Sequence, residues 1–95
     1  MERMSFNMII SPGFKLMNIA DEHILVPIGE KAVSFKGVVT LTEASYYLLN
    51  SMKEPRSKSD LADLLIQEFD VDVETAKADI DTFVAKLLDM GVIEN

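Results

Sequence analysis

The chain has 95 residues, enough for one domain, and its 48% hydrophobic content is typical of a packed globule rather than a disordered chain. It contains no cysteine, which excludes disulfides, thiolate metal sites and cysteine nucleophiles. Residues 1–59 hold six acids and seven bases, whereas residues 60–95 hold ten acids and two bases, so the net charge of −7 comes from the second half of the chain. An acidic half of this kind would repel phosphate backbones and attract basic peptides.

The first residues lack the pattern of a regular element. Met1–Ser11 is apolar without clear periodicity, so residues 1–11 are expected to be a poorly ordered segment that precedes a single domain over residues 12–95. The segment lacks the long apolar core of a signal peptide. No apolar run approaches the roughly 20 residues of a membrane span. We therefore expect a cytoplasmic chain with no membrane partner.

Two strands are expected next, joined as a hairpin. Pro12-Gly13 is a turn signal, and Phe14–Ala20 places alternate residues on opposite faces, as a strand does. Asp21-Glu22 supplies a reversal into a second strand, His23–Ile28. Pro27 cannot donate a ladder hydrogen bond, so we expect it near the end of this strand.

A third strand is expected to lead directly into a helix. Ala32–Phe35 and Val38–Leu41 both favour extended structure, and Lys36-Gly37 between them offers a bulge or a turn. One bent strand or two short strands would both fit, and we favour the single bent strand. Thr42 follows at once and can cap a helix, since its side chain can accept a backbone N–H of the first turn.

Three helices are expected in the second half. The first covers Glu43–Met52, the second begins near Ser57 or Ser59, and the third begins near Asp72, because Ser and Asp are preferred N-cap residues. Gly91 is suited to end the third helix in the left-handed conformation.

The order of the elements predicts an α+β fold, with an N-terminal three-stranded antiparallel sheet followed by three helices. This order is similar to a winged helix-turn-helix in which the sheet comes first. Val92-Ile93 is expected either to add a short final strand or to pack as a tail. Because a fold does not imply a function, the site is considered separately.

No residue pattern indicates a catalytic or metal site. His23 stands alone without a Ser or Cys nucleophile motif, and we interpret it as a half-exposed strand residue. Asp70, Asp72 and Glu74 lack the glycine and the terminal glutamate of a calcium loop, and helix capping explains them better. No phosphate-binding loop or pair of catalytic carboxylates is present. We therefore expect no enzyme, no cofactor and no metal.

The third helix occupies the position of a DNA-recognition helix but carries the wrong charge. Its outward residues are Lys77, Asp79, Asp81 and Lys86, with Asp89 beyond them. DNA affinity depends mainly on neutralised phosphates, so a net acidic helix argues against a nucleic-acid partner.

The segment Val38–Leu41 leaves two interpretations open. It is either an ordinary edge strand that the protein itself covers, or an edge to which a guest peptide adds as a further strand. From the residues alone, the covered edge is the simpler interpretation.

Several motifs resemble the PqqD family, named after pyrroloquinoline quinone biosynthesis. They are Pro12-Gly13-Phe14-Lys15-Leu16, Asp21-Glu22, Ile24-Leu25-Val26-Pro27, Leu41-Thr42-Glu43, Val71–Asp79 and Leu87–Glu94. The resemblance implies a non-catalytic peptide chaperone, or RiPP recognition element, that binds the leader of a ribosomally made precursor peptide. Proteins of this family then present the leader to a modifying enzyme, often a radical S-adenosylmethionine protein.

The resemblance also implies where the leader would bind, as a strand added to the third strand and lying against the third helix. The alternatives are a winged-helix regulator or a structural subunit in which the same strand edge pairs with itself in a homodimer. Carried over by position, the contacts implied are Val38, Val39, Thr40 and Leu41 on the strand and Lys77, Ile80, Asp81 and Val84 on the helix, with Ala76 and Phe83 expected in the core.

Overall fold

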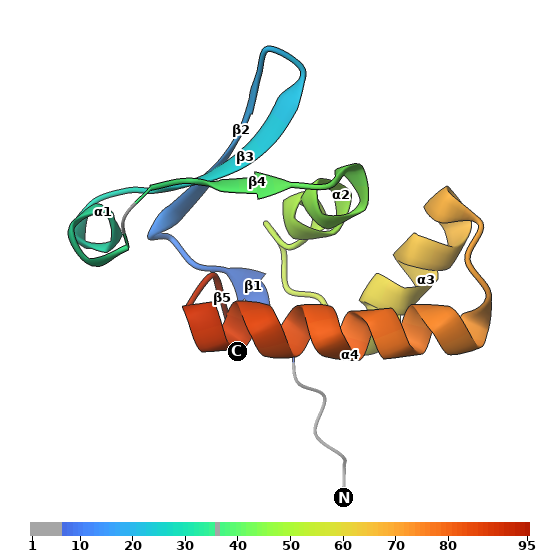
Figure 1. The fold of residues 1–95 in the computed structure, drawn as a ribbon. Helices are drawn as coiled ribbons and strands as arrows, with labels where there is room; N and C mark the ends of the chain where they lie inside the picture. Colours follow the sequence, from blue (N-terminus) through green and yellow to red (C-terminus); the bar gives the residue numbers. More distant parts are fainter. Residues whose placement is uncertain (1–6, 36) are drawn as a thin grey trace, which may run out of the picture.

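The computed structural model describes residues 7–35 and 37–95, and within them it shows a three-stranded sheet, a two-stranded sheet and four helices (Figure 1). In chain order the elements are β1 (Ile9–Ile10), β2 (Phe14–Ile19), β3 (Glu22–Pro27), α1 (Glu30–Ser34), β4 (Val39–Leu41), α2 (Glu43–Ser51), α3 (Lys58–Phe69), α4 (Val73–Met90) and β5 (Ile93–Glu94).

The three-stranded sheet is antiparallel, in the order β2-β3-β4. The β2–β3 hairpin closes on the pair Ile19↔Glu22, with Ala20 at φ 52° and Asp21 at φ 67° between them. Positive φ at both central residues is the signature of a type I′ turn, whose twist matches that of the flanking strands. The predicted hairpin is therefore confirmed, with its reversal shifted one residue toward the N-terminus.

The predicted bent third strand is wrong in its first half. Residues 30–34 form the short helix α1, while the strand is limited to β4; Lys36 lies outside the described residues. The Phe35 backbone N–H donates to the Lys31 carbonyl at 2.8 Å, and the Phe35 ring packs edge-on against Phe14 with centroids 5.3 Å apart. The helical turn is what brings Phe35 onto Phe14, a contact that local β-propensity does not reveal.

The three long helices begin where capping residues were predicted. Thr42 Oγ1 accepts the Ser45 N–H at 3.1 Å, and Ser57 forms a reciprocal capping box with Asp60. Asp72 Oδ1 accepts the Thr75 N–H at 3.1 Å. Helix α4 ends at Gly91, whose φ of 76° is left-handed as predicted.

The expectation of poor order is wrong for residues 8–11, whereas residues 1–6 lie outside the described part of the chain. Met8 is 2% exposed and pairs with Arg56 through two backbone hydrogen bonds of 2.7 and 2.9 Å. Strand β1 pairs antiparallel with β5, which confirms the short final strand. The partners of this segment lie more than 40 residues away in sequence, so no local pattern indicates them.

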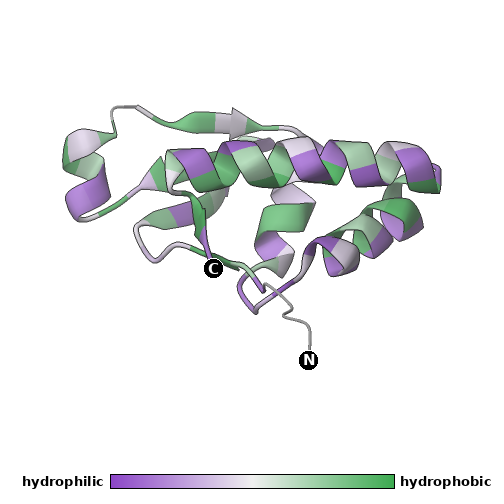
Figure 2. Cartoon of the chain, turned by 90° about the horizontal axis from the view of Figure 1, so that it is seen from below, coloured by the Kyte–Doolittle hydropathy of each residue, from purple (hydrophilic) through white to green (hydrophobic). Residues whose placement is uncertain are grey.

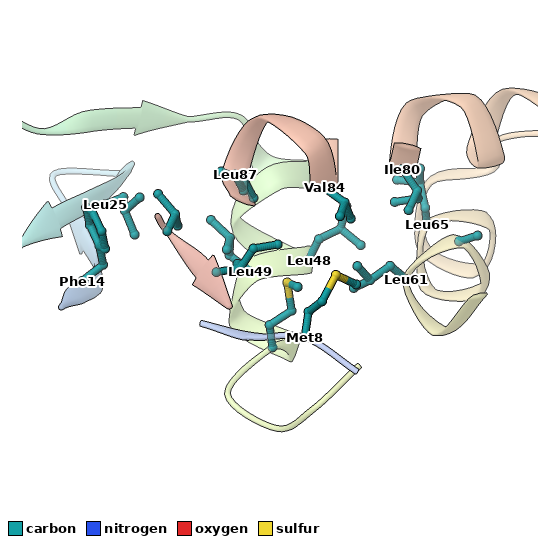
Figure 3. Close-up of a cluster of buried hydrophobic side chains, with 14 of the residues drawn as sticks. Met8, Phe14, Leu25, Leu48, Leu49, Leu61, Leu65, Ile80, Val84 and Leu87 are labelled. Atoms are coloured by element: carbon teal, nitrogen blue, oxygen red, sulfur yellow. The ribbon is translucent and has the colours of Figure 1, made fainter. Parts of the chain in front are cut away.

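The core lies between the sheet and the helices and is organised by α4 (Figure 3). One stripe of α4 is buried, namely Ala76, Ile80, Val84 and Leu87. It meets Leu48 and Leu49 of α2, Leu61 and Leu65 of α3 and Leu25 of β3 in a single cluster. Removal of one such large side chain typically costs about 2–5 kcal/mol of stability.

The α+β fold class predicted from the sequence is confirmed: a three-stranded antiparallel sheet precedes the three long helices, and α1, β1 and β5 are added to it. None of the helices in the described part of the chain has the length and apolar character needed to span a membrane.

The hairpin turn yields a stability prediction. Ala20 adopts a left-handed conformation that costs an L-residue with a Cβ about 1–2 kcal/mol and that Asn tolerates better. We expect Ala20→Asn to raise the free energy of unfolding by about 0.5–1 kcal/mol, measured by urea denaturation. The control Ala78→Asn, on the exposed surface of α4, should lower it by about 0.5 kcal/mol. A destabilised Ala20→Asn variant would contradict the turn assignment.

Candidate functional site

Strand β4 forms one edge of the three-stranded sheet, and its outer side has no strand partner among the described residues. The pattern of hydrogen bonds between β2 and β3 shows which backbone groups of β4 point toward β3 and which point outward. The Ile28 N–H donates to the Gly13 carbonyl at 2.8 Å, which makes this a hydrogen-bonded pair at the end of the β2–β3 ladder. Hydrogen-bonded pairs alternate in an antiparallel sheet, so His23 and Leu25 direct their backbone groups toward β4.

The same alternation gives the direction of the backbone N–H and C=O groups of β4. His23 lies opposite Leu41 and Leu25 opposite Val39, so Val39 and Leu41 bond to β3. The N–H and C=O of Thr40 then point to the open edge. Thr40 is also exposed, while the side chains of Val39 and Leu41 are half-buried against the core. Val39 and Leu41 therefore hold β4 against the sheet and the core, while the backbone of Thr40 is left to bind another strand.

The junction between β4 and α2 is held at several points. Thr42 caps α2, and its carbonyl accepts the Tyr46 N–H at 2.9 Å, so the helix starts one residue after the strand. The Tyr46 ring stacks on His23 of the neighbouring strand, with centroids 4.1 Å apart. His23 is thus a half-buried strand residue, as predicted. This arrangement keeps the edge of β4 rigid relative to the helices.

Of the four predicted helix contacts, two are buried and two lie on the side of α4 that faces α3. Ile80 and Val84 are each 1% exposed and belong to the core. Asp81 forms an ion pair of 3.1 Å with Lys58 at the start of α3, and Lys77 lines the same groove between the two helices. Of these four side chains, Ile80 also lines a cavity between α4 and α2, and the other three do not.

The other flank of α4 lies toward β4 and α2. Asp79, Phe83 and Lys86 line a cavity of about 360 Å³ together with Ile80 and Thr82 of the same helix. The opposite wall comes mainly from α2, with Ala44, Ser45 and Leu48, and Leu65 of α3 completes it. Seen from below, β4 runs along one side of α4 while α3 lies on the other (Figure 2). We name Asp79, Phe83 and Lys86 the strand-side flank. Phe83 is half-buried rather than a full core residue, in contrast to the sequence-based expectation.

The site combines three features with different chemical roles. The Thr40 backbone offers one donor and one acceptor to an extended chain. The cavity between α2 and α4 offers apolar surface from Leu48 and Phe83. Asp79 and Lys86 present opposite charges seven residues apart, which is about 10 Å along a helix. Such a site can hold an extended peptide by its backbone and select its side chains.

The residues of the strand-side flank left a partial signal in the sequence. They recur at i, i+4 and i+7, directly beside the apolar stripe of α4. Helical spacing therefore groups them correctly. The spacing does not show which flank of the buried stripe of α4 lies on the side of β4.

Asp72 positions the start of α4. Its carboxylate accepts hydrogen bonds from the side chain and the backbone N–H of Thr75, and these bonds hold the pKa of Asp72 below its usual value. The predicted capping role of this aspartate is confirmed. Among the described residues, no group of three or more His, Asp or Glu side chains is arranged to hold a metal ion.

Comparison with known proteins gives one family and several structures of the same fold. Residues 22–93 match the family described as coenzyme PQQ synthesis protein D (PqqD). Among curated proteins, the comparison gives no match.

Three solved structures share the fold of this chain. TbiB1 in complex with the TbiA(beta) leader peptide superposes with a TM-score of 0.73 at 20% identity, covering 92% of this chain and 95% of TbiB1. A lasso peptide synthetase B1 complexed with its leader peptide gives 0.72 at 17% identity, covering 93% and 98%. The PqqD part of Methylobacterium extorquens PqqCD, described as a stand-alone RiPP recognition element, gives 0.69 at 22% identity, covering 94% and 89%.

The Asp72 cap predicts a defined pH dependence of stability. Because the pKa is lowered in the folded state, the cap stabilises the protein fully above the ordinary Asp value of 3.8, and this contribution is lost as the pH falls through the lower folded pKa. We expect an NMR titration to give an Asp72 pKa below 3.8, and Asp72→Asn to remove this part of the acid dependence. Asp63→Asn, an exposed carboxylate in the middle of α3, should leave it unchanged.

Proposed function

This chain belongs to the PqqD family, and from that premise we propose that it is a non-catalytic peptide chaperone. It binds the leader of a ribosomally made precursor peptide and presents this leader to a modifying enzyme. The leader adds as a strand to the open edge of β4. The observation that carries the proposal is this open edge, with the Thr40 backbone directed outward. The cavity between the strand-side flank and α2, the helix that follows β4 in the chain, supports it.

The fold comparisons support the proposal. Two of the similar structures were solved with a leader peptide bound, and a third is described as a recognition element that functions by itself. The partners proposed for this chain are accordingly a precursor leader and a peptide-modifying enzyme of the radical S-adenosylmethionine class or another class. We propose that this takes place in the cytoplasm and needs no cofactor bound to this chain.

The strand contacts proposed are those expected from the sequence, Val38–Leu41. Thr40 supplies the backbone bonds, and Val38, which is 56% exposed, extends the edge on the N-terminal side. On α4 we propose the strand-side flank as the opposite wall, in place of the side that carries Lys77 and Asp81. The mixed charge of this flank favours a leader that carries a basic residue near Asp79 and an acidic residue near Lys86.

Thr40→Pro tests the strand addition. Proline removes the N–H that faces the guest and obstructs its close approach, but among the described residues of the free protein this N–H has no ladder partner to lose. With a synthetic peptide of the leader encoded beside this gene, we expect calorimetry to show affinity lower by about tenfold. Thr40→Val keeps both the N–H and the β-branched shape, so it should bind like the wild type.

Thermal unfolding of both Thr40 variants separates the two interpretations of the edge. A loss of stability in Thr40→Pro as large as its loss of binding free energy would mean that the edge is internal structure. Absence of saturable binding by any leader from the same locus would overturn the proposal as a whole.

A second pair of variants tests which flank of α4 forms the wall. The double variant Asp79→Ala/Lys86→Ala removes one acid and one base from the strand-side flank, and we expect it to weaken leader binding by about tenfold or less, as for partly exposed charges. Lys77→Ala/Asp81→Ala removes the same charges from the side facing α3 and should bind within about twofold of the wild type. The reverse order would return the site to the residues first expected from the sequence.

A further inference from the structure

The sheet has a second open edge, on β2, and the function proposed for β4 does not use it. Strand β2 has six residues, against three in β4, and pairs only with β3 among the described residues. Hydrogen-bonded pairs alternate along β2 and β3, starting from the pair Gly13 and Ile28. The backbone groups of Leu16 and Asn18 therefore face away from β3. A long edge of this kind is a template for pairing with another strand.

The open part of this edge is Lys15–Ile19. At the start of β2, the Phe14 N–H already donates to the Ser11 carbonyl at 3.2 Å, and the ring of Phe35 packs against Phe14. Toward its other end, β2 extends into the hairpin that projects beyond the helices (Figure 1). A partner strand therefore has access to Leu16 and Asn18 but not to Phe14.

The outer face of the hairpin is apolar beside this edge. Met17 and Ile19 of β2 share it with Ile24 and Val26 of β3, because residues directly opposite in an antiparallel pair point to the same face. Ile19 is 49% exposed. The opposite face, which carries Leu16 and Leu25, packs against the core.

The charges along the hairpin are arranged for antiparallel pairing with an identical strand. Lys15 lies at the start of β2, and Glu22 follows the turn at its far end. Within one copy, Lys15 stands opposite Val26, four residues or about 13 Å from Glu22 along the strand. In the described residues, neither side chain takes part in an ion pair. Antiparallel pairing of two copies would bring the base of each within side-chain reach of the acid of the other, across one intervening residue.

We propose that two copies of this chain associate through their β2 edges, in antiparallel register about a two-fold axis at Met17. Leu16 of each copy then exchanges backbone hydrogen bonds with Asn18 of the other, four bonds in all. Met17 faces Met17 across the axis, and Lys15 lies beside Ile19 of the second copy. Glu22 of that copy is one strand further, about 10 Å away between backbones, a span that a lysine and a glutamate side chain bridge together.

The distribution of charge over the whole chain favours this contact over other modes of self-association. Two copies with a net charge of −7 each repel, but the excess of acids lies in residues 60–95, away from the hairpin. The joined sheet has six strands with a β4 edge at each end, so both peptide sites stay open. A contact of one short strand buries less than about 1,200 Å², which is the range of weak, concentration-dependent association.

Mass measurement over a concentration series tests the dimer. Sedimentation of the wild type should show a mass that rises from 10.6 kDa toward twice that value as the concentration increases from micromolar to millimolar. Lys15→Glu places acid beside acid in the contact, and Glu22→Lys places base beside base. Each variant alone should therefore need at least a tenfold higher concentration to associate. An equimolar mixture of the two variants should restore association, because the acid introduced at position 15 of one copy then meets the base introduced at position 22 of the other.

Lys53→Glu is the matched control, since it changes the net charge as Lys15→Glu does but lies on an exposed loop after α2. It should associate like the wild type. A wild type that stays at 10.6 kDa up to millimolar concentration would overturn the proposal. So would a dimer that is indifferent to both charge variants and to their mixture but is abolished by Thr40→Pro, because that result assigns self-pairing to β4.

Discussion

Burial of one stripe of α4 is the constraint on which the rest of the structure depends. Ala76, Ile80, Val84 and Leu87 belong to one buried cluster with side chains of the sheet, α2 and α3. Once this stripe is inside, the two flanks of α4 are forced to different sides, one lining a groove with α3 and the other lining a cavity mainly with α2. The wall available to a peptide is thus decided by the core, because a helix has a single rotation about its axis that buries all four residues.

The central position of β3 has a comparable consequence for the sheet. Its backbone groups are divided alternately between β2 and β4, so each outer strand keeps one set of groups for the outside. The two edges differ in what surrounds them. The edge of β4 leads through the Thr42 cap into α2, which lines a cavity with α4, and this arrangement suits capture of a guest peptide. The edge of β2 lies on a projecting hairpin with self-complementary charges, which suits a second copy.

The elements that the sequence predicted well are those specified by neighbouring residues. Thr42, Ser57 and Asp72 cap helices because each side-chain oxygen reaches an N–H three residues further along, and Gly91 ends α4 for an equally local reason. The segment 30–35 was misjudged because its helical turn is stabilised by the packing of Phe35 on Phe14, about 20 residues earlier. Met8 was misjudged likewise, because its partner Arg56 is distant in sequence.

The sequence by itself therefore determined the hairpin, the capped starts of the three long helices and the resemblance to the family, while it missed α1 and β1. Only the tertiary structure showed that Asp79, Phe83 and Lys86 line a cavity with α2, whereas Asp81 pairs with Lys58 of α3. The physical reason is that spacing along a helix groups residues by face but does not orient the faces. Orientation is set by which apolar surfaces can be buried together, and that is a property of the assembled fold.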